Sequence, residues 1–189
     1  IGVSDPSLSD KNWWNELKHT PSFKPEYWSR YYDYLLKKPS WSITAVENIN
    51  SSTDEIMNSL TNPRKGIAGE RMGMVFGYVQ SGKTAHYIGM INKAYDAGYR
   101  IVIVLSGIHN SLRSQTQSRI DEEVLGYETS LESIGDMTRE RNAIGVGIGP
   151  YNQVETPVQS ITTRDEKGDV NKKTEGVSMM PPLMVVTKK

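Results

Sequence analysis

The sequence predicts an α/β protein in which a parallel sheet is preceded by a helical N-terminal segment. Residues 72–105 show a strand, helix and strand pattern. A glycine-rich phosphate-binding motif joins the first strand to the helix, and helical periodicity dominates the sequence before it. We therefore expect three parts: a helical segment (residues 1–65), a P-loop α/β core (66–125) and a polar, partly mobile segment (126–189) that ends in a strand.

Most of the aromatic residues lie in the N-terminal segment, within the first 41 positions. After Pro25, which suits a first helical turn, they recur at helical spacing up to Lys37. Ser42 is expected to cap a second helix, and the capping-box pattern at Ser52 predicts a third helix that ends before Pro63. Aromatic residues can also stack on nucleic-acid bases. Since the spacing places most of them on one helix face, we interpret the segment as core packing and not as a site.

The middle of the chain predicts the core elements. Residues 72–76 form a short apolar run typical of a buried strand, and residues 84–97 show helical spacing. The run YRIVIVL (99–105) is nearly all apolar and β-branched, as in a parallel strand covered on both faces. A further helix is expected from Asn110 to about Val124.

The chain is polar from Gly126 to Pro182, with many glycine and charged residues. An unstructured loop of that length is unusual inside one domain, so we expect it to be mobile or to fold against parts of a longer protein. A short strand is an option at residues 144–149. Residues 184–186 predict a last strand.

Composition excludes several kinds of function. Lys and Arg number 22, as do Asp and Glu, so bulk charge favours neither nucleic acid nor anionic membranes, although a local basic patch remains open. The absence of cysteine excludes disulfides, zinc–thiolate sites and cysteine nucleophiles. No apolar run could cross a membrane. The first residues contain neither an initiator Met nor a signal segment, so we expect a cytoplasmic protein and a piece of a longer one.

The motif GYVQSGKT at residues 77–84 matches G-x-x-x-x-G-K-[ST] at every position. Such glycines let backbone N–H groups converge on a phosphate, and the following helix adds its positive end. Lys83 is expected to bind the β- and γ-phosphates, and the Thr84 hydroxyl is expected to bind Mg²⁺. The predicted ligands are ATP and Mg²⁺, with Lys83 as the catalytic group. The predicted contact residues are Gly77, Gln80, Ser81, Gly82, Lys83 and Thr84.

The motif alone leaves the class of P-loop protein open. A GTPase should show D-x-x-G and N-K-x-D after apolar strands; residues 165–168 and 171–174 resemble these only superficially, since the second lacks its Asp. A small-molecule kinase needs an Arg-rich lid, and none is evident. In helicase-type ATPases a polar motif after the second strand holds a nucleic-acid backbone, and Arg113 and Gln115 lie there. A solvated helix face fits these two residues equally well.

Hydrolysis of ATP needs an acidic residue at the end of a later apolar strand, where it holds Mg²⁺ and orients the attacking water. The strand at 99–105 is followed by Ser106-Gly107, and the last strand by Thr187-Lys188-Lys189. We therefore expect the chain to bind a nucleotide without turning it over.

Residues Val75 to Asp121 resemble the Z-one domain endonuclease family, helicase-superfamily-two-like P-loop ATPases of bacterial restriction and phage-defence systems. The resemblance is most specific at residues 79–84, 97–100 and 109–116. It implies a RecA-like sheet in a larger protein that uses ATP to move on or remodel DNA, with other defence-system subunits as possible partners. By this resemblance Gly82, Lys83 and Thr84 contact the nucleotide.

The resemblance also places Arg113 and Gln115 at the nucleic-acid backbone. Two alternatives stay open beside it. One is a non-enzymatic interaction or regulatory module that holds a partner on an apolar surface of the helical segment. The other is a P-loop kinase or GTPase.

Overall fold

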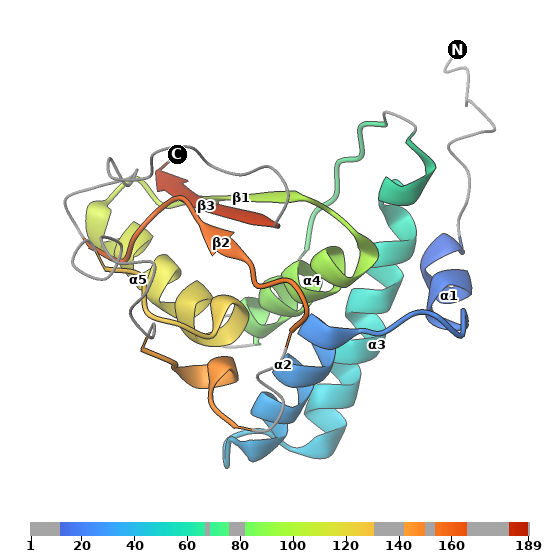
Figure 1. Ribbon diagram of the computed structural model, residues 1–189, viewed down its shortest axis with the longest axis horizontal. Helices are drawn as coiled ribbons and strands as arrows, with labels where there is room; N and C mark the ends of the chain where they lie inside the picture. Colours follow the sequence, from blue (N-terminus) through green and yellow to red (C-terminus); the bar gives the residue numbers. More distant parts are fainter. Residues whose placement is uncertain are drawn as a thin grey trace.

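The computed structural model describes residues 12–66, 69–75, 82–130, 142–149, 154–165 and 182–188. A small sheet lies over a layer of helices (Figure 1). The α-helices are α1 (Trp13–Lys18), α2 (Glu26–Lys37), α3 (Ile43–Ser59), α4 (Lys83–Ala97) and α5 (Asn110–Ile120). Single turns of 3-10 helix form η2 (Pro63–Lys65) and η5 (Gly145–Gly147), and a turn of π-helix forms η3 (Asp121–Leu125). The strands are β1 (Ile101–Ser106), β2 (Gln159–Ser160) and β3 (Leu183–Lys188). The predicted α/β class is confirmed, whereas a RecA-like arrangement remains an expectation.

All strand pairs in the sheet are parallel, in the order β1-β3-β2. β1 and β3 pair from Ile101 opposite Leu183 to Ser106 opposite Lys188. The predictions of a strand near 99–105 and of a last strand near 184–186 are therefore confirmed. The two-residue strand β2 was not predicted, because Gln159 and Ser160 carry no apolar pattern.

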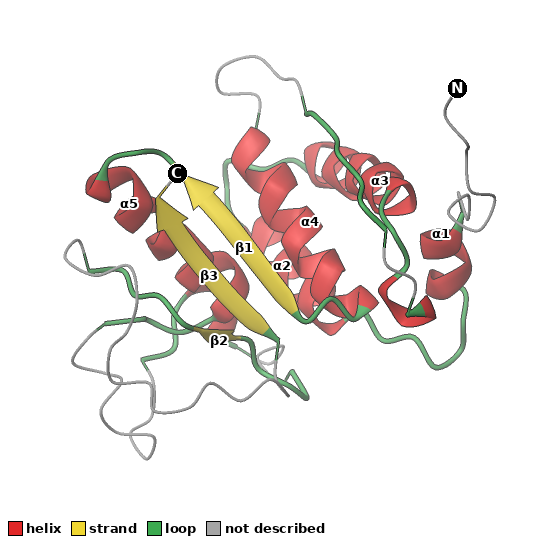
Figure 2. Cartoon of the chain, turned by 90° about the horizontal axis from the view of Figure 1, so that it is seen from above, coloured by secondary structure: helices red, strands yellow, loops and turns green. Residues whose placement is uncertain are grey.

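The prediction that β1 is covered on both faces is wrong for the described residues. Val102 and Val104 pack on the core below, whereas Ile101, Ile103 and Leu105 are 44%, 60% and 64% exposed. Figure 2 looks onto the face of the sheet that the helices leave open.

The strand predicted at residues 72–76 is not seen in its described part. Residues 69–75 form no regular structure, and Met72, Met74 and Val75 are 92%, 75% and 55% exposed. An apolar run becomes a strand only when a neighbouring strand pairs with it, and no described strand lies beside this one. Phe76 lies outside the described residues.

α3 is one continuous helix where the sequence predicted two. Ser42 caps it as expected, since its Oγ accepts a hydrogen bond from the Ala45 N–H at 3.1 Å. The predicted cap at Ser52 fails because the hydroxyls there donate to carbonyls of the preceding turn: Ser52 to Ile49 at 3.2 Å, and Thr53 to Ile49 at 2.7 Å. Similarly, residues 145–147 form the turn η5 and not a strand.

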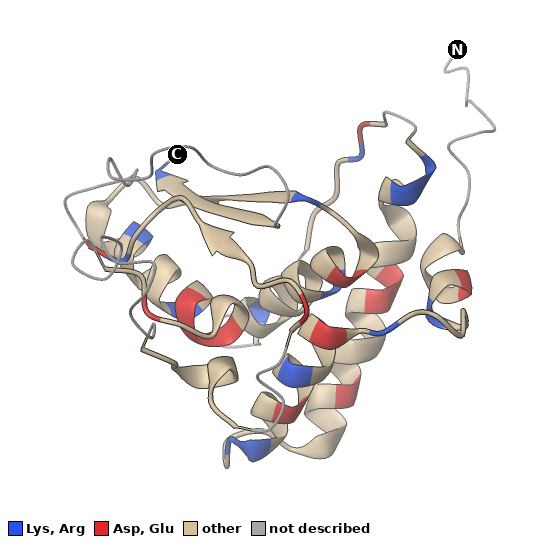
Figure 3. Cartoon of the chain, viewed as in Figure 1, with Lys and Arg blue, Asp and Glu red and all other residues tan. Residues whose placement is uncertain are grey.

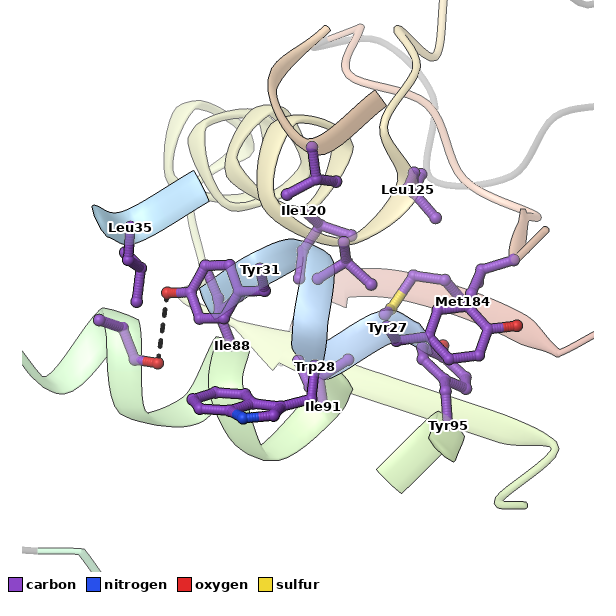
Figure 4. Close-up of a cluster of buried hydrophobic side chains, with 14 of the residues drawn as sticks. Tyr27, Trp28, Tyr31, Leu35, Ile88, Ile91, Tyr95, Ile120, Leu125 and Met184 are labelled. Carbon is purple, nitrogen blue, oxygen red and sulfur yellow. Dashed lines mark hydrogen bonds between the residues drawn. The ribbon is translucent and has the colours of Figure 1, made fainter. Parts of the chain in front are cut away.

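The aromatic residues of α2 lie in the core, so the packing interpretation is confirmed. Tyr27, Trp28 and Tyr31 belong to one buried cluster that also contains side chains of α4, η3 and β3 (Figure 4). α2 and α4 approach closely at Gly89, where a Cβ would lie 3.0 Å from the Trp28 ring. The same cluster includes residues from all three predicted parts of the chain.

Buried charged groups join the helices to one another. The Lys93 ammonium of α4 is 1% exposed and donates to the Asp54 carboxylate of α3 at 2.7 Å. Burial lowers the pKa of Lys93 to about 8. Asp96, also on α4, accepts hydrogen bonds from the Tyr27 and Trp28 N–H groups at 3.0 and 2.8 Å and so caps the start of α2.

Candidate nucleotide-binding site

The end of the predicted phosphate motif forms the start of α4, as expected. Gly82 has φ 76°, in the left-handed region that favours glycine, and Lys83 is the first helical residue. The helix runs to Ala97 and is followed by Gly98 at φ 104°, which confirms the predicted helix. Gly77, Gln80 and Ser81 lie outside the described residues. The first N–H groups of a helix have no acceptor within the helix, and a helix start of this kind favours an anion.

A pocket of about 400 Å³ opens at this helix start. Its size is in the range of small-molecule sites. The helical N-terminal segment, which was interpreted as packing only, forms one wall through α2 and the turn that follows it. The start of α4 forms another wall, and α5 with η3 forms the third. The lining residues are Tyr31, Leu35, Lys38, Ser40, Trp41, Gly82, Lys83, Thr84, Ala85, Arg119 and Glu123.

The pocket gathers positive charge from three elements. Lys38 follows α2, Lys83 begins α4 and Arg119 is on α5. Among the described lining residues, Glu123 is the single carboxylate, and its Oε1 lies 3.0 Å from the Lys38 ammonium. The negative charge of Glu123 balances one of the three basic residues, so the described lining keeps an excess of positive charge. Such an excess suits a phosphate chain.

Tyr31 links the α4 and η3 walls. Its hydroxyl lies 3.4 Å from the carbonyl oxygen of Ala85 and 3.5 Å from Oε2 of Glu123. Burial, reinforced by the Glu123 carboxylate, raises the pKa of Tyr31 far above its ordinary value. The phenol therefore stays protonated and acts as a donor. On the other side, the Trp41 ring lies against Gly82, where a Cβ would be 3.3 Å from it.

The structure contradicts the prediction that Arg113 contacts nucleic acid. Arg113 is fully buried, and its Nη1 donates to the Thr163 carbonyl at 2.8 Å. Its Nη2 donates to the Asp165 carbonyl. The guanidinium thus anchors the segment before β3 and faces away from solvent. Gln115 is exposed on α5, so its contact with nucleic acid stays a prediction.

Basic residues are spread over several helices in Figure 3 and form no continuous stripe on the described part of α5. This agrees with the balance of 22 basic and 22 acidic residues. The overall charge therefore gives no support of its own to nucleic-acid binding.

Lys38, Trp41, Arg119 and Glu123 were not predicted as site residues. Lys38 comes directly after the predicted end of the helix at Lys37. Lys38 and Glu123 are 85 positions apart, and no spacing rule connects them. The common signal is weak: each is a charged or aromatic residue at or near a helix end.

Comparisons with protein-family models, with curated proteins and with solved structures found no match. The site is therefore argued from the motif and the pocket. In the part of the chain that the structure describes, no helix has the length and apolarity needed to cross a bilayer. The same part contains no group of three or more His, Asp or Glu side chains arranged for a metal ion. In the described lining, the Thr84 hydroxyl is the oxygen that the motif predicts for Mg²⁺.

Proposed function

We propose that the chain binds Mg·ATP in the pocket at the start of α4. The observation that carries this proposal is the meeting of the motif residues Gly82, Lys83 and Thr84 with two further cations, Lys38 and Arg119, around one cavity. The three cations exceed the one carboxylate among the described lining residues, which favours an anionic ligand. The match of residues 77–84 to the phosphate-binding motif points to the same ligand.

Each motif residue has a separate task in this proposal. The backbone N–H groups at the start of α4 bind phosphate oxygens, and the Lys83 ammonium adds a charge-assisted contact. The Thr84 hydroxyl is half-buried at the pocket wall and serves as a protein ligand for Mg²⁺. Bound Mg²⁺ neutralises phosphate charge. We assign the adenine to the side of the pocket near Trp41, a half-buried aromatic side chain of its lining.

We propose binding without turnover for this chain. β1 ends at Ser106, whose hydroxyl donates to the Thr187 carbonyl at 3.0 Å, and β3 ends at Lys188. Neither strand end carries the carboxylate that P-loop ATPases use to orient water. We further propose that the chain is part of a larger ATPase that acts on DNA in a restriction or phage-defence system. This wider role is supported by the resemblance of residues 75–121 alone.

The interaction-module alternative finds little support in the helical segment. Among its described large hydrophobic residues, only Leu36 and Ile43 are more than a third exposed. The open apolar surface lies on β1 instead, at Ile101, Ile103 and Leu105. Comparing the binding affinity for ATP with that for GTP distinguishes a GTPase or kinase role from the proposed function.

Calorimetric titration with Mg·ATP tests the proposal, with Lys83→Ala as the site variant and Lys65→Ala as a control on the exposed turn η2. We expect micromolar binding by the wild-type chain, weakened about tenfold or more by Lys83→Ala because a charge-assisted phosphate contact is lost. Lys65→Ala should bind as the wild type does. Equal affinity in a folded Lys83→Ala variant would refute the site.

A further inference from the structure

Among the described residues that line the pocket, Glu123 is the one anionic group, and it lies where an anionic ligand is proposed to bind. The Glu123 side chain is 5% exposed, and its Oε1 forms an ion pair with Lys38 at 3.0 Å. A buried carboxylate needs a partner, and here the partner comes from a different wall of the pocket. A phosphate chain entering beside Glu123 would meet repulsion unless the charges in the pocket rearrange.

We propose that Lys38 is a second phosphate-binding lysine of this pocket, and that Glu123 holds its charge until the nucleotide arrives. This inference rests on the function proposed above and adds a residue of the helical N-terminal segment to the phosphate site. Glu123 thus occupies, within the chain itself, the contact that a phosphate oxygen takes on binding.

The two partners differ in their freedom to move, and this decides which of them changes place. Glu123 is almost fully buried on η3, and the Tyr31 hydroxyl faces its second oxygen at 3.5 Å. Lys38 is 32% exposed, lies just beyond the last residue of α2 in an extended conformation, and carries a flexible four-carbon stem. The lysine can therefore turn towards a phosphate while the carboxylate stays fixed.

The surroundings of Lys38 support an exchange of partners. Its ammonium also lies 4.2 Å from the centre of the Tyr34 ring, so one side of the cation is held by an aromatic face rather than by a second carboxylate. When Lys38 turns away, Glu123 keeps the neighbouring Tyr31 donor, and Arg119 lines the same pocket. The carboxylate is then not left alone in an apolar site.

The exchange predicts opposite effects for the two partners. Replacing Lys38 by Gln removes a phosphate contact, so we expect nucleotide affinity to fall about tenfold. Replacing Glu123 by Gln removes both the competitor for Lys38 and a negative charge near the phosphates. Affinity should therefore rise about three- to tenfold.

The experiment is a calorimetric titration of the full chain with Mg·ATP and, separately, with inorganic tripolyphosphate and Mg²⁺. The variants are Lys38→Gln, Glu123→Gln and the control Lys37→Gln. Lys37 is the adjacent lysine on α2, is exposed, and does not line this pocket. We expect the opposite shifts with both ligands and no change for Lys37→Gln. Tripolyphosphate isolates the phosphate contacts from those of the base.

Opposite shifts cannot come from loss of folding, since a poorly folded variant does not bind more tightly than the wild type. If Glu123→Gln weakens binding, the carboxylate supports the ligand or shapes the pocket, and the inference is overturned. No shift in either variant overturns it as well. If the folded wild-type chain binds neither ligand, the proposed function fails and the inference fails with it. If the wild-type chain binds and the affinities of the two variants shift in the same direction, the inference fails while the proposed function stands.

Discussion

Replacement of Arg113 distinguishes a structural role from the nucleic-acid contact that the sequence suggested. The guanidinium is fully buried and donates to the carbonyl oxygens of Thr163 and Asp165. In Arg113→Ala these two carbonyls lose their charged donor and the buried stem leaves a cavity. Exposed Gln115, two positions away on α5, provides a matched control.

The magnitude follows from these contacts. Hydrogen bonds to a charged group contribute about 1.5–3 kcal/mol each, and relief from burying the charge offsets part of their loss. Loss of the buried methylene groups adds to the cost. We therefore expect Arg113→Ala to lower the free energy of unfolding by about 3 kcal/mol, a large share of a typical domain's stability. Gln115→Ala should stay within about 0.5 kcal/mol of the wild type.

Urea denaturation followed by circular dichroism measures both variants, and Arg113→Lys separates charge from geometry. Lysine keeps the charge but cannot donate to two carbonyls in a fixed fork, so it should recover only part of the loss. A wild-type midpoint for Arg113→Ala, together with weaker binding to DNA, would refute the structural role and restore the sequence-based interpretation.

Two further predictions concern the helix start and the buried carboxylates. Gly82→Ala places a side chain in the left-handed region at φ 76° and against Trp41, which costs about 1–2 kcal/mol locally. Mg·ATP affinity measured by titration should therefore fall several-fold. An unchanged affinity would contradict this geometry. Burial raises the pKa of Asp96 to about 7 and that of Asp121 to about 6, from 3.8. Both groups therefore bind protons more tightly in the folded state, and the stability that they contribute below pH 4 is lost as pH rises to 7. In urea denaturation between pH 4 and 7 the wild type should lose stability relative to Asp96→Asn/Asp121→Asn, and a gain would show that the sign is wrong.

The elements that could be predicted are those whose local pattern agrees with their packing. β1 was predicted because its run of apolar, β-branched residues has few alternatives to a strand. α4 was predicted from the helical spacing of residues 84–97, and Gly98 has the positive φ that is common just after a helix end. The run at 72–76 looks equally good locally, yet its described residues lie exposed without a partner strand. An apolar run indicates that a segment favours burial. Whether it is buried depends on whether the tertiary structure supplies a neighbouring element to pack against.

The errors at α3 and Arg113 have a shared cause. In both places a polar side chain forms a hydrogen bond to a backbone carbonyl that sequence spacing does not predict. The hydroxyls near Ser52 bond to their own helix, which continues through the predicted break. The Arg113 guanidinium bonds to carbonyls about 50 positions away. A polar residue in the sequence therefore does not reliably predict an exposed side chain, because backbone carbonyls of distant loops can accept its hydrogen bonds in the interior.

The position of the pocket relative to the core explains why a site can depend on residues so distant in sequence. Tyr31 and Leu35 line the pocket and also belong to the main buried cluster, together with Ala85 at the start of α4. Ile120 and Val124 of the same cluster flank the segment that carries Glu123. Packing of the core thus sets the distances between the three walls before any ligand binds. Lys38 is 32% exposed and Lys83 is exposed, so both side chains lie outside the core cluster. A pocket with a buried floor and a flexible, partly exposed Lys38 is suited to exchanging an internal carboxylate for a phosphate.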